Sequence, residues 1–86
     1  MTELDQLRQE IDRLDADIVK LLSERFEVVR RIGDVKKREG LPVLNAAREQ
    51  IVLEKVAGMV KNEEEKLALQ RVYKEIMAAA KDLEKK

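Results

Sequence analysis

Residues 4–37, LDQLRQEIDRLDADIVKLLSERFEVVRRIGDVKK, decide the fold of this chain, because apolar side chains recur along them at alternating steps of three and four. This heptad spacing is typical of one long helix with a single apolar stripe. The stripe consists of Leu4, Leu7, Ile11, Leu14, Ile18, Leu21, Val28, Ile32 and Val35, with a gap at Arg25. Thr2 together with Asp5 predicts a capped start of the helix. Gly40 and Pro42 predict its end.

The expected helix is long for a chain of 86 residues. At about 1.5 Å per residue it would extend about 50 Å, which is too long for a compact domain of this size. Much of its apolar stripe would therefore have no cover from its own chain. We expect a second copy of the long helix to pack against this stripe.

The remaining sequence predicts two shorter helices. Residues 40–44 are typical of an extended loop, and Asn45 is a typical N-cap for a helix over about 46–60. Polar residues follow, and a third apolar stripe predicts a helix over about 64–84. With the first helix over about 3–38, we expect an all-α fold of three helices that forms one domain over residues 1–86.

The composition excludes several classes of function. The chain has no cysteine and no histidine, which excludes disulfides, the usual zinc sites and Ser-His or Cys-His catalysis. Lys plus Arg and Asp plus Glu balance at 18 each, and only one Tyr and one Phe are present, so we expect no nucleic-acid partner. The polar N-terminus does not resemble a signal peptide, and no apolar run reaches transmembrane length. We therefore expect a cytoplasmic protein without a membrane partner.

Arg25 occupies a position on the apolar stripe that leucine or isoleucine would otherwise fill. It is either a snorkelling or register-setting arginine, or a ligand for an anion. Lys36 lies 11 residues further along, which places it within about 20° of the same direction and about 16 Å along the helix axis. Two long side chains at this spacing can converge on one small ligand, although Lys36 alone is also explained as a solvated surface lysine.

Three further charged residues are candidates for the same anion site. Arg48 and Glu49 fall in the first turn of the second helix, where free N–H groups and the helix dipole favour anions. Arg48 is not favoured by that dipole and so indicates a bound carboxylate, whereas Glu49 is also explained as a dipole-stabilising surface group. Glu84 lies in the last turn of the third helix, where a carboxylate is disfavoured, and its alternative is an exposed residue at a fraying end.

Arg8 lies beside the stripe near the start of the long helix. It is about 25 Å along the axis and roughly 100° around it from Arg25, so the two arginines of one chain cannot hold the same small molecule. If both belong to one site, Arg8 must come from another chain. This is the same second chain that the uncovered stripe requires.

In this combination the residues resemble the all-helical class of chorismate mutases, and the similarity covers nearly the whole chain. It is carried by the segments LRQEIDRLDADIVKLLSER (7–25), GDVKKREGLPVLNAAREQIVLEKV (33–56) and VYKEIMAAAKDLE (72–84). The first contains the family pattern L-R-x-x-I-D-x-[LI]-D-x-x-[IL]-x-x-L-[LI]-x-x-R. Leucine and isoleucine at helical spacing occur in any bundle. A set of charged residues in register is far less common, and here it comprises Arg8, Arg25, Lys36, Arg48 and Glu49.

The resemblance implies an isomerase that rearranges chorismate to prephenate, at the branch towards phenylalanine and tyrosine. It also implies an intertwined homodimer, in which the partner's long helix completes each of two active sites. The reaction is a unimolecular pericyclic shift without proton transfer or covalent intermediate, so we expect no cofactor and no metal. Such an enzyme holds the dianionic substrate in a chair-like conformer and stabilises the negative charge that develops on the ether oxygen.

The resemblance also implies a role for each site residue. Arg8 of the partner subunit, Arg25 and Arg48 would hold the two carboxylates, which the planar guanidinium binds bidentately. Lys36 would donate to the ether oxygen. Glu49 would accept a hydrogen bond from the ring hydroxyl, which the backbone N–H around Asn45 would also contact.

Three positions depart from the common pattern of that family. Asn45 stands where aspartate is common, and Ala80 replaces a serine that helps to bind a carboxylate. Glu84 falls where many members have a glutamine that faces the ether oxygen. A glutamate can donate only when it is protonated, so we expect burial to favour the protonated Glu84 and activity to fall as the pH rises. The substitution Glu84→Gln should then change little.

Three alternative functions stay open from the sequence. Isochorismate-pyruvate lyase resembles this fold and uses a similar cationic site, although Glu49 favours the mutase because it would serve the chorismate hydroxyl. The second alternative is a non-catalytic dimerisation or regulatory module. In that case Arg25→Ala or Arg25→Leu should raise the stability of the protein without functional loss. The third alternative is a domain that is fused to, or docked on, a shikimate-pathway synthase and regulated through it.

Overall fold

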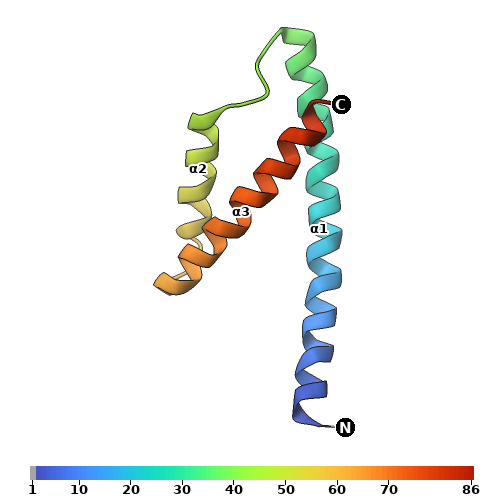
Figure 1. Cartoon of the computed structure of the whole chain (residues 1–86), viewed down its shortest axis with the longest axis vertical. Coiled ribbons are helices and arrows are strands. Elements are labelled where there is room, and N and C mark those ends of the chain that lie inside the picture. The colour runs from blue at the N-terminus through green and yellow to red at the C-terminus, as the bar shows by residue number, and fades with distance from the viewer. Residues whose placement is uncertain (1) are drawn as a thin grey trace.

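The computed structural model describes residues 2–86, and these residues form three α-helices. The helices are α1 (Glu3–Glu39), α2 (Ala46–Ala57) and α3 (Glu63–Glu84) (Figure 1). Within residues 2–86 there is no β-strand. The all-α fold with one long N-terminal helix is thus confirmed. No helix in this range is long and apolar enough to cross a membrane.

Both ends of α1 have the caps that the sequence predicts. The Thr2 hydroxyl accepts a hydrogen bond from the Asp5 N–H at 3.1 Å, and the Thr2 N–H donates to the Asp5 carboxylate at 3.5 Å, which completes a capping box. At the other end Gly40 adopts the left-handed conformation with φ of 69°. Glycine takes this conformation without steric cost, and the N–H of Leu41 then bonds back to the Lys36 carbonyl at 2.8 Å.

An asparagine directly precedes each of the helices α2 and α3 and serves as its N-cap. The side-chain oxygen of Asn45 accepts from the Arg48 N–H at 3.0 Å, and Asn62 does the same for Glu65 at 3.0 Å. The helix α2 ends at Ala57, earlier than the expected position near 60. Gly58 still has right-handed helical dihedrals, with φ of −70° and ψ of −12°, and the chain then turns over residues 58–62 until Asn62, in extended backbone, caps α3.

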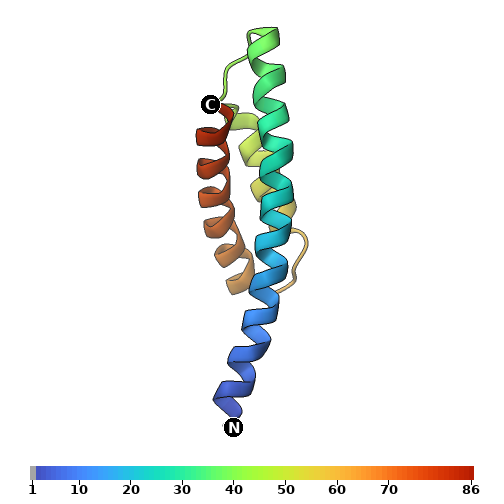
Figure 2. The same cartoon turned by 90° about the vertical axis from the view of Figure 1, so that its right-hand side faces the viewer.

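The helix α3 runs diagonally from α2 to α1, to one side of both, and packs against each of them (Figures 1 and 2). Within residues 2–86, α1 and α2 make no helix–helix contact with each other. The N-terminal half of α1 projects beyond α2 and α3 (Figures 1 and 2). The radius of gyration is 16.1 Å, whereas a compact chain of this length would have about 12 Å. The chain is therefore elongated.

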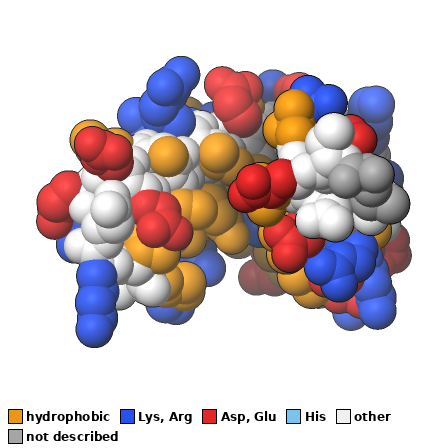
Figure 3. Space-filling view, turned by 90° about the horizontal axis from the view of Figure 1, so that it is seen from below, with side chains coloured by type: hydrophobic (Ala, Val, Ile, Leu, Met, Phe, Trp, Pro, Cys, Tyr) orange, Lys and Arg blue, Asp and Glu red, His pale blue; other side chains and the backbone are white. Residues whose placement is uncertain are grey.

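The apolar stripe on the projecting half of α1 is uncovered by its own chain, as the sequence predicts. About half of the side-chain surface is exposed at Leu4, Leu7, Ile11, Leu14 and Ile18. The buried apolar core is correspondingly small and comprises Val29, Val56, Met77 and Ala80. Seen from the N-terminal end of α1, hydrophobic side chains lie at the surface between α1 and the other two helices (Figure 3).

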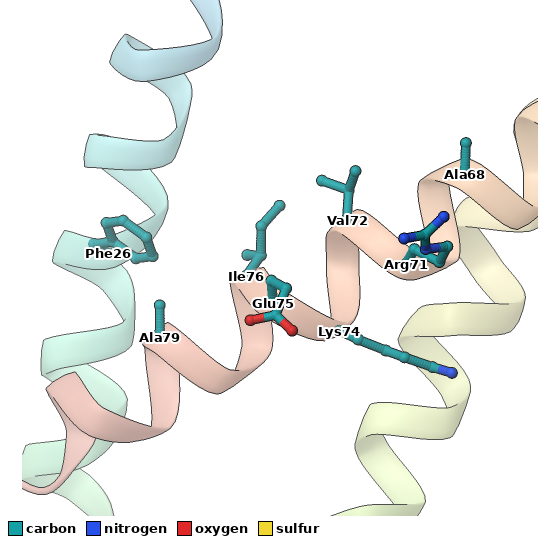
Figure 4. A pocket seen from close by; sticks show the side chains of 8 residues that line it. All are labelled: Phe26, Ala68, Arg71, Val72, Lys74, Glu75, Ile76 and Ala79. Atoms are coloured by element: carbon teal, nitrogen blue, oxygen red, sulfur yellow. The ribbon is translucent and has the colours of Figure 1, made fainter.

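A wide apolar groove of about 770 Å³ lies between α1 and α3. Phe26 projects from α1 towards a row of small and branched side chains on α3 (Figure 4), namely Ala68, Val72, Ile76 and Ala79. Val72 lies in this groove and is 54% exposed. The groove contains none of the residues that the sequence marked as site candidates, so it is not the candidate active site although it is the larger hollow.

Candidate active site

A second pocket, of about 430 Å³, brings together most of the charged residues that the sequence singled out. The set comprises Arg25, Lys36, Asn45, Arg48, Glu49, Ala80 and Glu84. These residues come from all three helices and from the N-cap of α2. Apolar side chains such as Val29 and Met77 form the rest of the wall. A pocket of this size and mixed lining is typical of small-molecule sites.

Arg25 lines this pocket and carries a buried hydrogen-bond donor. Its Nη1 atom is buried and has no hydrogen-bond partner among residues 2–86. The guanidinium carbon lies 6.0 Å from the centre of the Tyr73 ring on α3, which is within range of a cation–π interaction. A buried donor without an acceptor is costly, and an anionic ligand would relieve that cost. The register-setting alternative explains the arginine but not this unused donor.

Lys36 and Glu84 form a close ion pair within the pocket. The Lys36 Nζ lies 2.6 Å from Glu84 Oε1, and the side chains are 19% and 9% exposed. The same Nζ donates a hydrogen bond to the Val43 carbonyl at 2.8 Å in the α1–α2 connection. The Glu84 oxygen makes an electrostatic contact and not a hydrogen bond of good angle. The alternatives of a solvated Lys36 and a fraying Glu84 are therefore wrong.

Gly33 determines how closely Glu84 approaches α1. A Cβ atom on Gly33 would lie 2.9 Å from both the Cα and the carbonyl oxygen of Glu84. The two helix backbones therefore touch at this point, which glycine permits because it has no side chain. Gly33 precedes Lys36 by less than one helical turn, so this contact places the Glu84 carboxylate beside the Lys36 ammonium.

The first turn of α2 contributes Arg48 and Glu49 to the pocket. The Asn45 side chain caps the helix, so it fills the structural role that an aspartate would also fill. Arg48 is exposed, and Glu49 is half-buried. The Glu49 Oε2 lies 3.1 Å from the Nζ of Lys81 on α3. Lys81 also lines the pocket, although it was not among the residues predicted from the sequence. Its position next to Ala80 is the signal that could have indicated it.

Arg8 does not lie in this pocket. It is exposed on the projecting half of α1. Ala80 is buried in the pocket wall and provides no hydroxyl for a ligand. One chain thus places three cationic candidates together, Arg25, Lys36 and Arg48, and leaves the fourth elsewhere.

Comparisons with known proteins agree with this geometry. A family model described as chorismate mutase type II matches residues 7–85. The bifunctional chorismate mutase/prephenate dehydratase of Aquifex aeolicus is 40% identical over 94 aligned residues, which cover 100% of this chain and 25% of that protein. An intracellular chorismate mutase of Mycobacterium tuberculosis is 45% identical over 53 residues, or 62% of this chain and 50% of that protein. This chain thus spans about a quarter to a half of these two relatives.

A solved structure also resembles the whole chain. The structure of chorismate mutase, form II, from Thermus thermophilus superposes with a TM-score of 0.92 and 32% sequence identity. The superposition covers 99% of this chain and 97% of that chain. The similarity therefore extends over all three helices.

Proposed function

This chain belongs to the chorismate mutase type II family, and on that premise we propose that it is an isomerase that rearranges chorismate to prephenate. The observation that carries this proposal is the buried, unpaired Nη1 of Arg25 in a pocket that also holds Lys36 and Arg48. The pocket is lined by four cationic side chains, with Lys81 as the fourth, and by two carboxylates, so the net positive charge of its lining fits a dianionic substrate. The pocket volume of about 430 Å³ is suited to a molecule of this size.

The chemistry requires orientation and charge stabilisation. Arg25 and Arg48 would hold the substrate carboxylates, and the apolar wall at Val29 and Met77 would contact the ring. Holding the chair-like conformer lowers the barrier because the reacting carbon atoms are brought together before the bond forms. No proton transfer, cofactor or metal is needed for this step.

Lys36 and Glu84 are the groups that would face the breaking C–O bond. Negative charge grows on the ether oxygen in the transition state, and a donor aimed at it stabilises the transition state more than the ground state. The Lys36 ammonium would supply that donor, and the Glu84 carboxylate, 2.6 Å from the same ammonium, would hold it in place. Glu49, about 29% exposed at the side of the pocket, would accept from the ring hydroxyl.

We propose further that the active unit is a homodimer with two shared sites. The projecting half of α1 bears half-exposed Leu7 and Ile11 with Arg8 between them. Packing of a second copy against this stripe would cover these half-exposed side chains, each of which would gain about half of the ~1.5–3 kcal/mol that complete burial from full exposure provides. The Arg8 of a chain does not reach the pocket of that chain. In the dimer, Arg8 of the partner subunit would reach it instead.

The wider setting follows from the relatives. The name of the Aquifex aeolicus protein pairs a chorismate mutase with a prephenate dehydratase, which supports fusion to, or docking on, another enzyme of the shikimate pathway. The name of the mycobacterial relative describes it as intracellular, which supports a cytoplasmic location.

Incubation of the purified chain with chorismate tests the proposal. We expect chorismate to disappear and prephenate to be the product. Arg25→Ala should abolish turnover while circular dichroism shows a folded helical protein. Arg31→Ala, which removes an exposed arginine of α1 outside the pocket, is the matched control and should retain activity. Absence of turnover, or release of pyruvate from isochorismate instead, would contradict the proposed function.

A further inference from the structure

The last turn of α3 contacts both other helices through charged side chains. Glu84 pairs with Lys36 of α1, and Lys81 pairs with Glu49 of α2. The Lys81 Nζ lies 3.1 Å from the Glu49 Oε2, and both residues line the same pocket. From this geometry we propose that Lys81 is a positioning residue, which holds the Glu49 carboxylate ready to accept the substrate hydroxyl. This inference rests on the proposed function.

The Lys81–Glu49 pair differs from an ordinary surface ion pair. Its side chains are 32% and 29% exposed, and it joins two helices. The pair Lys66–Glu63 on the same helix provides the contrast. It links residues three apart at 3.3 Å, and the Glu63 side chain is 84% exposed. Pairs of that second kind contribute little to stability and have no ligand to orient.

Without Lys81, the Glu49 carboxylate could form an ion pair with another cation of the pocket. Arg25, Lys36 and Arg48 line the same pocket, and each could attract it. The Lys81 ammonium occupies one oxygen of Glu49, Oε2, and leaves Oε1 to accept a hydrogen bond from the substrate. It thereby keeps the two arginines available for the substrate carboxylates.

Lys81 also fixes the rotamer of Glu49. A glutamate side chain has three rotatable bonds, and its freedom is lost when it binds a ligand. An ion pair across two helices restricts these bonds before the substrate arrives, so less freedom is lost on binding. The effect of Lys81 should therefore be seen mainly in the apparent affinity for substrate.

The test compares Lys81→Met in two backgrounds of the full chain, with chorismate as the substrate. In the wild-type background we expect kcat/KM to fall about fivefold, mainly through KM, which is the upper range for a partly exposed ion pair. Lys81→Arg should restore most of the loss because it retains the charge. In the Glu49→Gln background the same substitution should change kcat/KM by less than about 1.5-fold, because coupled residues are not additive.

Controls separate the outcomes of this experiment. Lys66→Met removes a lysine of similar exposure from α3, 30% against 32% for Lys81, and should leave activity unchanged. If Lys81→Met lowers the melting temperature markedly, the same comparison of kcat/KM in the two backgrounds is made with Lys81→Gln, which removes the charge but keeps a polar side chain. A wild-type chain without chorismate turnover would refute the proposed function. An active wild type with unchanged Lys81→Met, or with an equal loss in both backgrounds, would overturn the role of Lys81 alone.

Discussion

Replacing Gly33 by alanine should lower kcat while the chain stays folded. The new Cβ would lie 2.9 Å from two backbone atoms of Glu84, whereas ordinary contacts of a Cβ begin near 3.4 Å, so the last turn of α3 must retreat by about 0.5 Å. The obstruction is backbone and cannot rotate away. The retreat would carry the Glu84 carboxylate away from Lys36, to which it lies 2.6 Å in the native chain.

Two opposing energies determine how much Gly33→Ala changes the free energy of unfolding. Overpacking costs about 1–3 kcal/mol, and alanine in place of glycine within a helix returns about 1 kcal/mol. The net loss of unfolding free energy should thus be about 0–2 kcal/mol. A shift of about 1 Å in a catalytic group can cost about 100-fold in rate, so a shift of half that size should lower kcat about tenfold.

The assay measures kcat, KM and urea unfolding for Gly33→Ala and for a matched glycine. Gly58→Ala is that control, because its Cβ would meet the nearest carbonyl oxygens at 3.5 and 3.6 Å, which are ordinary contacts. We expect Gly58→Ala to retain wild-type kcat. An unchanged kcat in Gly33→Ala, or an equal loss in both variants, would refute the role assigned to the α1–α3 contact.

Three further predictions test other parts of the site. Glu84→Gln should change kcat/KM by less than about threefold, because glutamine has nearly the same shape and its amide can donate a hydrogen bond to the ether oxygen; a loss of more than about tenfold would contradict a donor at this position. Tyr73→Leu should raise KM about two- to fivefold by loss of the contact with Arg25, whereas Tyr73→Phe should not; equal effects of the two substitutions would exclude a cation–π origin. Ile11→Lys places a charge on the uncovered stripe, so we expect a monomer in analytical ultracentrifugation and loss of turnover. A fully active Ile11→Lys monomer would show that one chain suffices for catalysis.

Local features of this fold were predictable because they depend on neighbours in the sequence. The caps at Thr2 and Asn45 and the stop at Gly40 depend only on residues within one or two helical turns. The end of α2 was placed too late because Met59 continued the apolar pattern, and the pattern does not reveal that Asn62 is needed as the next cap.

The members of the site were predictable in part. The spacing of Arg25 and Lys36 on one helix indicated a shared direction, and the structure places both in one pocket. The contacts of α3 were not predictable, because they depend on how closely it crosses the other helices. Lys81 therefore went unnoticed, and Gly33 gave no signal of the backbone contact that positions Glu84.

Each proposed active site combines Arg25 of one chain with Arg8 of the partner subunit. The most direct test mixes two inactive variants, Arg8→Ala and Arg25→Ala, in equal amounts and refolds them together. In a mixed dimer one site has both arginines intact and the other has neither, so random pairing should restore about a quarter of wild-type activity. Each variant refolded alone should stay inactive. Absence of recovery from the mixture, with mixed dimers demonstrated by mass spectrometry, would contradict the shared site.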